Sequence, residues 1–257
     1  VTATGYRINS YCAKNKLALL VKSVYNKTWM ASSKRGMIRM KEFYTTVAGA
    51  ADAEFVERRS RFIAHVRPVE HENDALAFLN QCKQEYWDAT HNVYAYCLEE
   101  NQLMRYSDDG EPGGTAGLPV LDILKREGLS NLIVVVTRYF GGILLGTGGL
   151  VHAYSKAAKL GIEKAGIADQ ILCRTLTLHC AYPLLGKLQN LLARWETLIC
   201  TEPVYTDTVS LPVYIPLCEA ENFCKKMIDL TNAQIQIEEG ALCWQSKVRV
   251  AAALDEV

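Results

Sequence analysis

A glycine-rich junction between an apolar strand and an amphipathic helix is the feature that most constrains the fold of this 257-residue chain. Residues 132–139 (LIVVVTRY) form a continuous apolar run rich in β-branched side chains, which is typical of a strand covered on both faces. Residues 150–165 carry apolar side chains at helical spacing, which predicts an amphipathic helix. The sequence therefore predicts an α+β protein in which a buried strand leads through a loop into a helix.

This junction carries five glycines, namely Gly141, Gly142, Gly146, Gly148 and Gly149. Glycines between a strand and a helix allow close backbone approach, and they expose backbone N–H groups at the start of the helix, which suits phosphate binding. Arg138 and Tyr139 end the strand, and Arg138 would add a bidentate contact to a phosphate or carboxylate. The alternative is that the glycines only let the helix pack closely on the sheet.

A second unusual loop spans residues 106–119 and holds four glycines, two prolines and three carboxylates in 14 residues. Its carboxylates are Asp108, Asp109 and Glu111. Three acids this close together could bind a hard cation such as Mg²⁺. They could equally form a solvated turn, cap the helix that follows, or pair with a nearby arginine.

The common nucleotide and nucleophile motifs do not fit. Val151 stands where a dinucleotide-binding motif needs glycine or alanine, no GK[ST] sequence follows the glycines, and the serine of a G-x-S-x-G turn is missing. Nine cysteines without a CxxC pair predict reduced, mostly buried thiols in a cytoplasmic protein rather than a zinc site. We therefore predict no catalytic residue, no metal ligand and no cofactor, and the lack of a long apolar run predicts no membrane span.

Residues 1–39 differ in charge from the rest of the chain. They contain eight Lys+Arg and no Asp or Glu, so the remaining residues carry 28 − 8 = 20 basic against 28 acidic side chains. Three interpretations stay open: a basic arm that binds nucleic acid, a transit peptide, or translated upstream DNA before a start at Met40. Under any of them, this segment is a non-native leader or a basic extension outside the fold.

Two domains follow, residues 40–170 and 171–257. In the first, alternation and apolar runs predict strands near 40–48, 53–57, 61–66, 91–98 and 132–139, with helices near 70–86, 119–125 and 150–165. Residues 167–170 are interpreted as the junction. In the second, strands are predicted at 175–181, 197–205, 208–215 and 233–238, with helices at 183–195 and 217–230. The resulting order βαββαβ is that of a ferredoxin-like domain.

Both loops resemble the signatures of the YigZ/IMPACT family. The similarity is carried by Tyr106–Pro119 (YSDDGEPGGTAGLP) and Arg138–Tyr154 (RYFGGILLGTGGLVHAY), with weaker matches at 60–63, which include Arg61, and at 89–91, which include His91. The resemblance implies a first domain with the βαβ fold shared by RNase PH and a small-subunit ribosomal protein. It also implies a second domain like the fifth domain of elongation factor G. Eukaryotic members regulate translation initiation.

We therefore predict a non-catalytic binding or regulatory protein linked to translation, with RNA, the ribosome or a translation-associated protein as its partner. The predicted binding residues come from both loops and from the two weaker matches, and they are Asp108, Asp109, Glu111, Arg138, Tyr139, Gly141, Gly142, Gly146, Gly148, Gly149, Arg61 and His91. A cluster of four arginines at 58, 59, 61 and 67 would give the surface a local basic patch, or would be a solvated strand and turn. The alternative function is a Mg²⁺-dependent hydrolase or phosphoryl enzyme that uses Asp108, Asp109 and Glu111.

Overall fold

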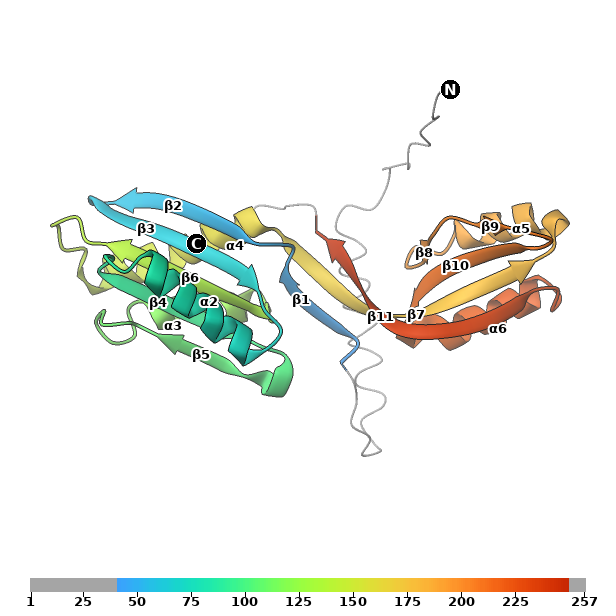
Figure 1. Cartoon of the computed structure of the whole chain (residues 1–257), viewed down its shortest axis with the longest axis horizontal. Coiled ribbons are helices and arrows are strands. Elements are labelled where there is room, and N and C mark those ends of the chain that lie inside the picture. Colours follow the sequence, from blue (N-terminus) through green and yellow to red (C-terminus); the bar gives the residue numbers. More distant parts are fainter. Residues whose placement is uncertain (1–40, 250–257) are drawn as a thin grey trace, which may run out of the picture. The chain divides into compact units, whose positions relative to one another are not determined.

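The computed structural model describes residues 41–249, so the predictions for residues 1–39 lie outside the described part of the chain (Figure 1). Within residues 41–249 the structure has two β-sheets and five α-helices, which confirms the predicted α+β class. No helix in this range is long and apolar enough to cross a membrane.

The first sheet is antiparallel throughout and has the strand order β2-β3-β6-β4-β5. Its strands are β2 (Ala51–Glu57), β3 (Ser60–Pro68), β4 (His91–Cys97), β5 (Met104–Ser107) and β6 (Leu132–Tyr139). The short strand β5 was not predicted, because three of its four side chains are exposed and the segment carries no apolar pattern.

Helices cover both faces of this sheet (Figure 1). The helices α3 (Gly117–Arg126) and α4 (Gly146–Ala165) pack together on one face, and α2 (Glu72–Glu85) packs on the other. The central strand β6 sends Val134 and Val136 into the first core and Ile133 and Val135 into the second. The prediction of a strand buried on both faces is therefore confirmed.

The second sheet is built around the 14-residue strand β7 (Ile167–Cys180). One edge of β7 pairs with β1 (Phe43–Val47) and then with β10 (Val209–Pro216), and its other edge pairs with β11 (Gln236–Val248). The strands β8 (Ile199–Cys200) and β9 (Val204–Tyr205) both pair with β10. Helices α5 (Tyr182–Leu192) and α6 (Ala220–Leu230) supply the core on one face of this sheet. Two short 3₁₀ helices are also present: η1 (Glu100–Gln102) lies between β4 and β5, and η2 (Leu217–Glu219) lies between β10 and α6.

Two details differ from the prediction. Residues 167–170, interpreted as a junction, belong to β7, so the expected boundary at 170 falls inside a strand. The single strand predicted at 197–205 is two strands of two residues each. Asp169 and Gln170 made the segment look like a polar connection, yet Asp169 is buried and bonded to Thr45 and Arg249.

Candidate functional site

Strand register brings Arg138 and His91 side by side. Arg138 lies opposite Phe62 of β3 on one side and opposite His91 of β4 on the other. Residues directly opposite each other in an antiparallel pair point to the same face of the sheet. Two predicted residues that are 47 positions apart in sequence therefore share one face at the end of β6.

Glu111, from the acidic loop, joins this pair. Its Oε1 accepts a hydrogen bond from Nη1 of Arg138 at 2.5 Å and another from the hydroxyl of Tyr154 at 2.7 Å. The side chains of Arg138 and Glu111 are only 6% and 4% exposed, so this is a buried ion pair. Burial, followed by the charge of Glu111, raises the pKa of Tyr154, and its phenol therefore remains a protonated donor.

The Arg138 guanidinium is enclosed by aromatic rings. It lies 5.4 Å from the ring centroid of Phe62 and 5.6 Å from that of Phe140. Nη2 reaches Ser60 Oγ at 3.4 Å, and the buried Nε has no hydrogen-bond partner among residues 41–249. Planar guanidinium groups stack well on aromatic faces, so the two rings fix the orientation of Arg138.

His91 presents one ring nitrogen to the same cluster. Its Nδ1 lies 2.8 Å from the carbonyl oxygen of Asp109, which only accepts, so Nδ1 carries the proton. When the ring is neutral, Nε2 is then an acceptor, and it lies 3.8 Å from Oε1 of Glu111. The cluster therefore places a histidine acceptor beside the Arg138–Glu111 pair.

A cavity of about 450 Å³ opens above this cluster, and we call it the loop pocket. It is lined by Thr90, His91, Glu111, Pro112, Arg138, Phe140, Leu144, Leu145, Gly146, Thr147 and Leu150. Both loops that the sequence singled out contribute to it, so they meet in space. Of the predicted residues, His91, Glu111, Arg138 and Gly146 line the pocket. The apolar walls were missed, because single leucines and prolines in loops carry no signal of their own.

The first turn of α4 also borders the loop pocket. The helix begins at Gly146 rather than at the predicted Leu150, so Gly146, Gly148 and Gly149 lie within its first turn. Leu145 precedes the helix and provides no side-chain cap. The first amide groups of a helix have no partner within the helix, and they create a partial positive charge there.

The other two carboxylates of the acidic loop face elsewhere. Asp108 accepts hydrogen bonds from the backbone amides of Gly114, Ala116 and Gly117 at 2.8, 3.1 and 2.7 Å, so it fastens the loop to the start of α3. Asp109 pairs with Lys83 at 3.0 Å and accepts from the amide of Asn92 at 2.7 Å.

The three carboxylates thus have separate roles, and residues 41–249 contain no group of three or more His, Cys, Asp or Glu arranged to hold a metal. Two of the alternatives left open by the sequence therefore both occur: Asp108 caps the start of α3, and Glu111 pairs with Arg138.

The remaining predicted residues do not line the loop pocket. Tyr139 donates to Asp88 at 2.8 Å, and burial, then this carboxylate, raises its pKa. Arg61 pairs with Glu54 and lies 5.7 Å from the ring centroid of Tyr139. Gly141 lies directly against the Arg59–Ser60 peptide, where an added Cβ would be 2.1 Å from the carbonyl carbon of Arg59. Gly142, with φ of +81°, faces open space.

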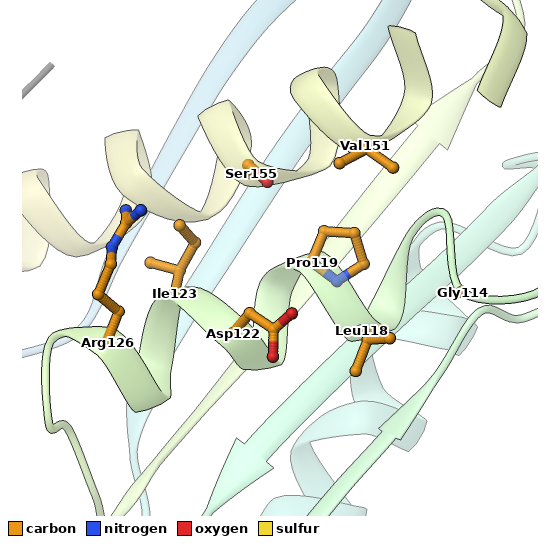
Figure 2. Close-up of a pocket in the computed structure, with 8 residues that line it drawn as sticks. All are labelled: Gly114, Leu118, Pro119, Asp122, Ile123, Arg126, Val151 and Ser155. Atoms are coloured by element: carbon orange, nitrogen blue, oxygen red, sulfur yellow. The ribbon is translucent and has the colours of Figure 1, made fainter. Parts of the chain in front are cut away.

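Another hollow, of about 480 Å³, lies between α3 and α4 (Figure 2). Asp122 and Arg126 of α3 and Val151 and Ser155 of α4 border it, together with Gly114, Leu118, Pro119 and Ile123. None of the predicted site residues lines this hollow. The loop pocket is therefore the candidate functional site.

Comparison with known proteins identifies two matching family models. The model of the Impact N-terminal domain matches residues 58–162, which include both loops and the whole loop pocket. A model described as a domain of unknown function, DUF1949, matches residues 178–234.

Bacterial relatives are similar to this chain over most of their own length. The IMPACT family member YvyE of Bacillus subtilis is 40% identical over 205 residues, covering 79% of this chain and 94% of the relative. The IMPACT family member YigZ of Escherichia coli is 34% identical over 193 residues, covering 73% and 94%. A solved structure, described as the crystal structure of a hypothetical protein, superposes with a TM-score of 0.50 at 31% identity and covers 77% of this chain and 97% of that one. The chain therefore belongs to the IMPACT family.

Proposed function

We propose that the protein is a non-catalytic, cytoplasmic binding protein linked to translation, and that its loop pocket recognises an anionic group on the ribosome or a ribosome-bound partner. We propose also that its halves have the folds that the family resemblance implies, an RNase PH-like fold and a ferredoxin-like fold. The second is supported by the antiparallel order β11-β7-β10-β8 and by the chain order of strands and helices.

The observation that carries the proposal is the uncapped start of α4 in a largely apolar pocket beside Arg138 and His91. Exposed helix amides attract anions, and apolar walls lower the local dielectric, which strengthens that attraction. Phe140 and Leu144, which are 46% and 81% exposed, border the pocket and would contact the partner around the anion.

A binding role fits this chemistry better than catalysis. The titratable side chains that line the loop pocket are His91, Glu111 and Arg138, and the last two neutralise each other in a buried pair. Breaking such a pair to free either group for proton transfer would leave an uncompensated buried charge. The open donors in the pocket are then the first backbone amides of α4, which can bind an anion but cannot transfer a proton readily.

Co-sedimentation with ribosomes tests the proposal through Thr147, an exposed pocket residue in the first turn of α4. Thr147→Asp places a negative charge where it favours the helix, so the fold is retained while an incoming anion is repelled. Thr147→Asn introduces a side chain of the same size as aspartate but without its charge, so it serves as the matched control.

We expect the unsubstituted chain and Thr147→Asn to co-sediment with ribosomes at low salt, and Thr147→Asp to lose most of this binding. Thermal unfolding of both variants checks that they fold. If Thr147→Asp co-sediments as well as the control, the loop pocket is not the contact.

A further inference from the structure

The turn between β2 and β3 has an unusual composition for its backbone. Glu57 and Ser60 pair across the hairpin, and the two residues between them, Arg58 and Arg59, have φ of +42° and +67°. Two-residue hairpin turns of this kind favour Asn-Gly, because both positions need positive φ. Two arginines here strain the backbone, and such strain is concentrated at functional sites.

These two arginines also differ from their neighbours in charge pairing. Arg61 is paired with Glu54 and Arg67 with Asp52. Arg58 and Arg59 are exposed, and neither forms an ion pair with any residue of the described range 41–249. The predicted four-arginine patch is thus reduced to two free cations at the tip of one hairpin, which we call the arginine turn.

The arginine turn is fixed to the loop pocket. Gly141 contacts the Arg59–Ser60 peptide, and its amide donates to Ser60 Oγ at 3.2 Å. Phe140, the residue before Gly141, is 46% exposed at the mouth of the pocket. The backbone of the turn that carries the two free cations therefore contacts the residue that follows an exposed aromatic ring.

A second exposed aromatic ring lies on the adjoining segment. Trp87 is 81% exposed, whereas tryptophan side chains are highly buried on average. Its neighbour Asp88 accepts from Tyr139, and Thr90 Oγ1 accepts from the amide of Phe140 at 3.1 Å. The segment that carries Trp87 is thus bonded to the segment that carries Phe140.

We infer that the arginine turn, Trp87 and Phe140 form a binding surface for a single-stranded nucleic acid, with phosphates at Arg58 and Arg59 and bases stacked on the two rings. Free cations beside exposed aromatic faces are the combination that single strands require, because a duplex hides the faces of its bases. An acidic peptide would use the cations but would leave the rings without a matching partner. This inference rests on the proposed function, since it names the class of partner that approaches the loop pocket.

The test variant is the double substitution Arg58→Asn with Arg59→Gly. It removes both charges and installs the pair that this turn favours, so the hairpin remains folded and the melting temperature should hold or rise. Arg194→Ala, which removes one exposed arginine from the other half of the chain, is the control for the loss of a surface charge outside the arginine turn.

Binding of labelled single-stranded RNA and DNA of one sequence is measured by fluorescence anisotropy with the full chain across a range of salt concentrations. Each phosphate contact on a single strand contributes about 0.7 to the slope of log K against log salt, so the double variant should have a slope shallower by about 1.4. The ratio of the affinity of the unsubstituted chain to that of the double variant should then fall about sevenfold between 50 and 200 mM salt. The comparison of slopes cancels the contribution of the eight cations in residues 1–39.

Phe140→Ala should weaken binding about fivefold or more at every salt concentration, because stacking does not depend on counterions. Tyr205→Ala, which removes a 56% exposed ring elsewhere, should leave binding unchanged. Equal binding of RNA and DNA would mean that the surface recognises only phosphates and bases, which both strands share. A preference for RNA would mean that the surface also contacts the 2′-hydroxyl.

An unchanged slope in the double variant overturns the inference, as does a turn-dependent affinity for polyglutamate with none for nucleic acid. Loss of ribosome binding in Thr147→Asp but not in the double variant would leave the proposed function standing and remove this surface alone.

Discussion

Oε1 of Glu111 lies 2.5 Å from Nη1 of Arg138, and both side chains are buried. This bond connects the acidic loop to the end of β6 across 27 residues, and it brings the two signature segments of the family together. A buried pair contributes little net stability compared with apolar packing, but removing one partner is costly. The pair therefore holds the shape of the loop pocket more than it stabilises the chain.

Glu111→Gln should lower the free energy of unfolding by about 3 kcal/mol, because the amide keeps the size of Glu111 but leaves the Arg138 charge uncompensated. Urea unfolding followed by circular dichroism measures this loss. Arg138→Met should be similarly destabilising alone, and the double variant should recover part of the stability. A loss below about 1 kcal/mol in both single variants would mean that solvent reaches the pair.

Asp108→Asn should lower the free energy of unfolding by about 1–2 kcal/mol. One carboxylate oxygen of Asp108 accepts from the backbone amides of both Ala116 and Gly117. The neutral amide oxygen of asparagine is a weaker acceptor than this carboxylate oxygen, and the amide nitrogen cannot accept at all. Because Asp108 is used as a cap, we expect Mg²⁺ to leave the melting temperature of both proteins unchanged. A rise with Mg²⁺ in the wild type that Asp108→Asn abolishes would contradict this assignment and revive the metal-dependent alternative.

Gly141→Ala should be strongly destabilising, by about 2 kcal/mol or more, because its Cβ would collide with backbone of the arginine turn rather than with a movable side chain. Gly148→Ala is the matched control in the same glycine-rich segment. A Cβ there meets nothing within 4 Å, so this variant should be neutral or gain up to about 1 kcal/mol as a helical alanine. Equal melting temperatures for the two variants would show that the loop moves away from the turn.

Local patterns predicted much of this architecture. The apolar run of β6 and the spacing in α4 were sufficient to place a buried strand before a helix, and the glycines between them indicated a shaped loop. The motifs also identified the two segments that meet at the loop pocket. Local patterns describe the conformation of neighbouring residues, and the positions of β6, α4 and the loop between them depend mainly on such neighbours.

Long-range partners could not be predicted in the same way. Asp169 reads as a polar junction residue, yet it is buried because Arg249, 80 positions away, bonds it at 2.9 Å. The partner of Glu111 likewise depends on the register that sets β6 beside β4. Strand register and sheet order arise from the whole core, so the lining of a pocket between loops is not visible in spacing alone.

The pH dependence of stability should report on His65, which is 3% exposed and bonded through Nδ1 to Asp52 at 3.0 Å. Burial, the largest effect, lowers the pKa of His65, while the bond to Asp52 opposes this shift. The unfolded chain therefore binds a proton more readily than the folded chain, and stability must fall as the pH drops below about 6.5, the ordinary value for histidine. Urea unfolding between pH 7.5 and about 5 measures this loss, and His65→Gln should reduce it. The same slope in the variant would assign the effect to other groups.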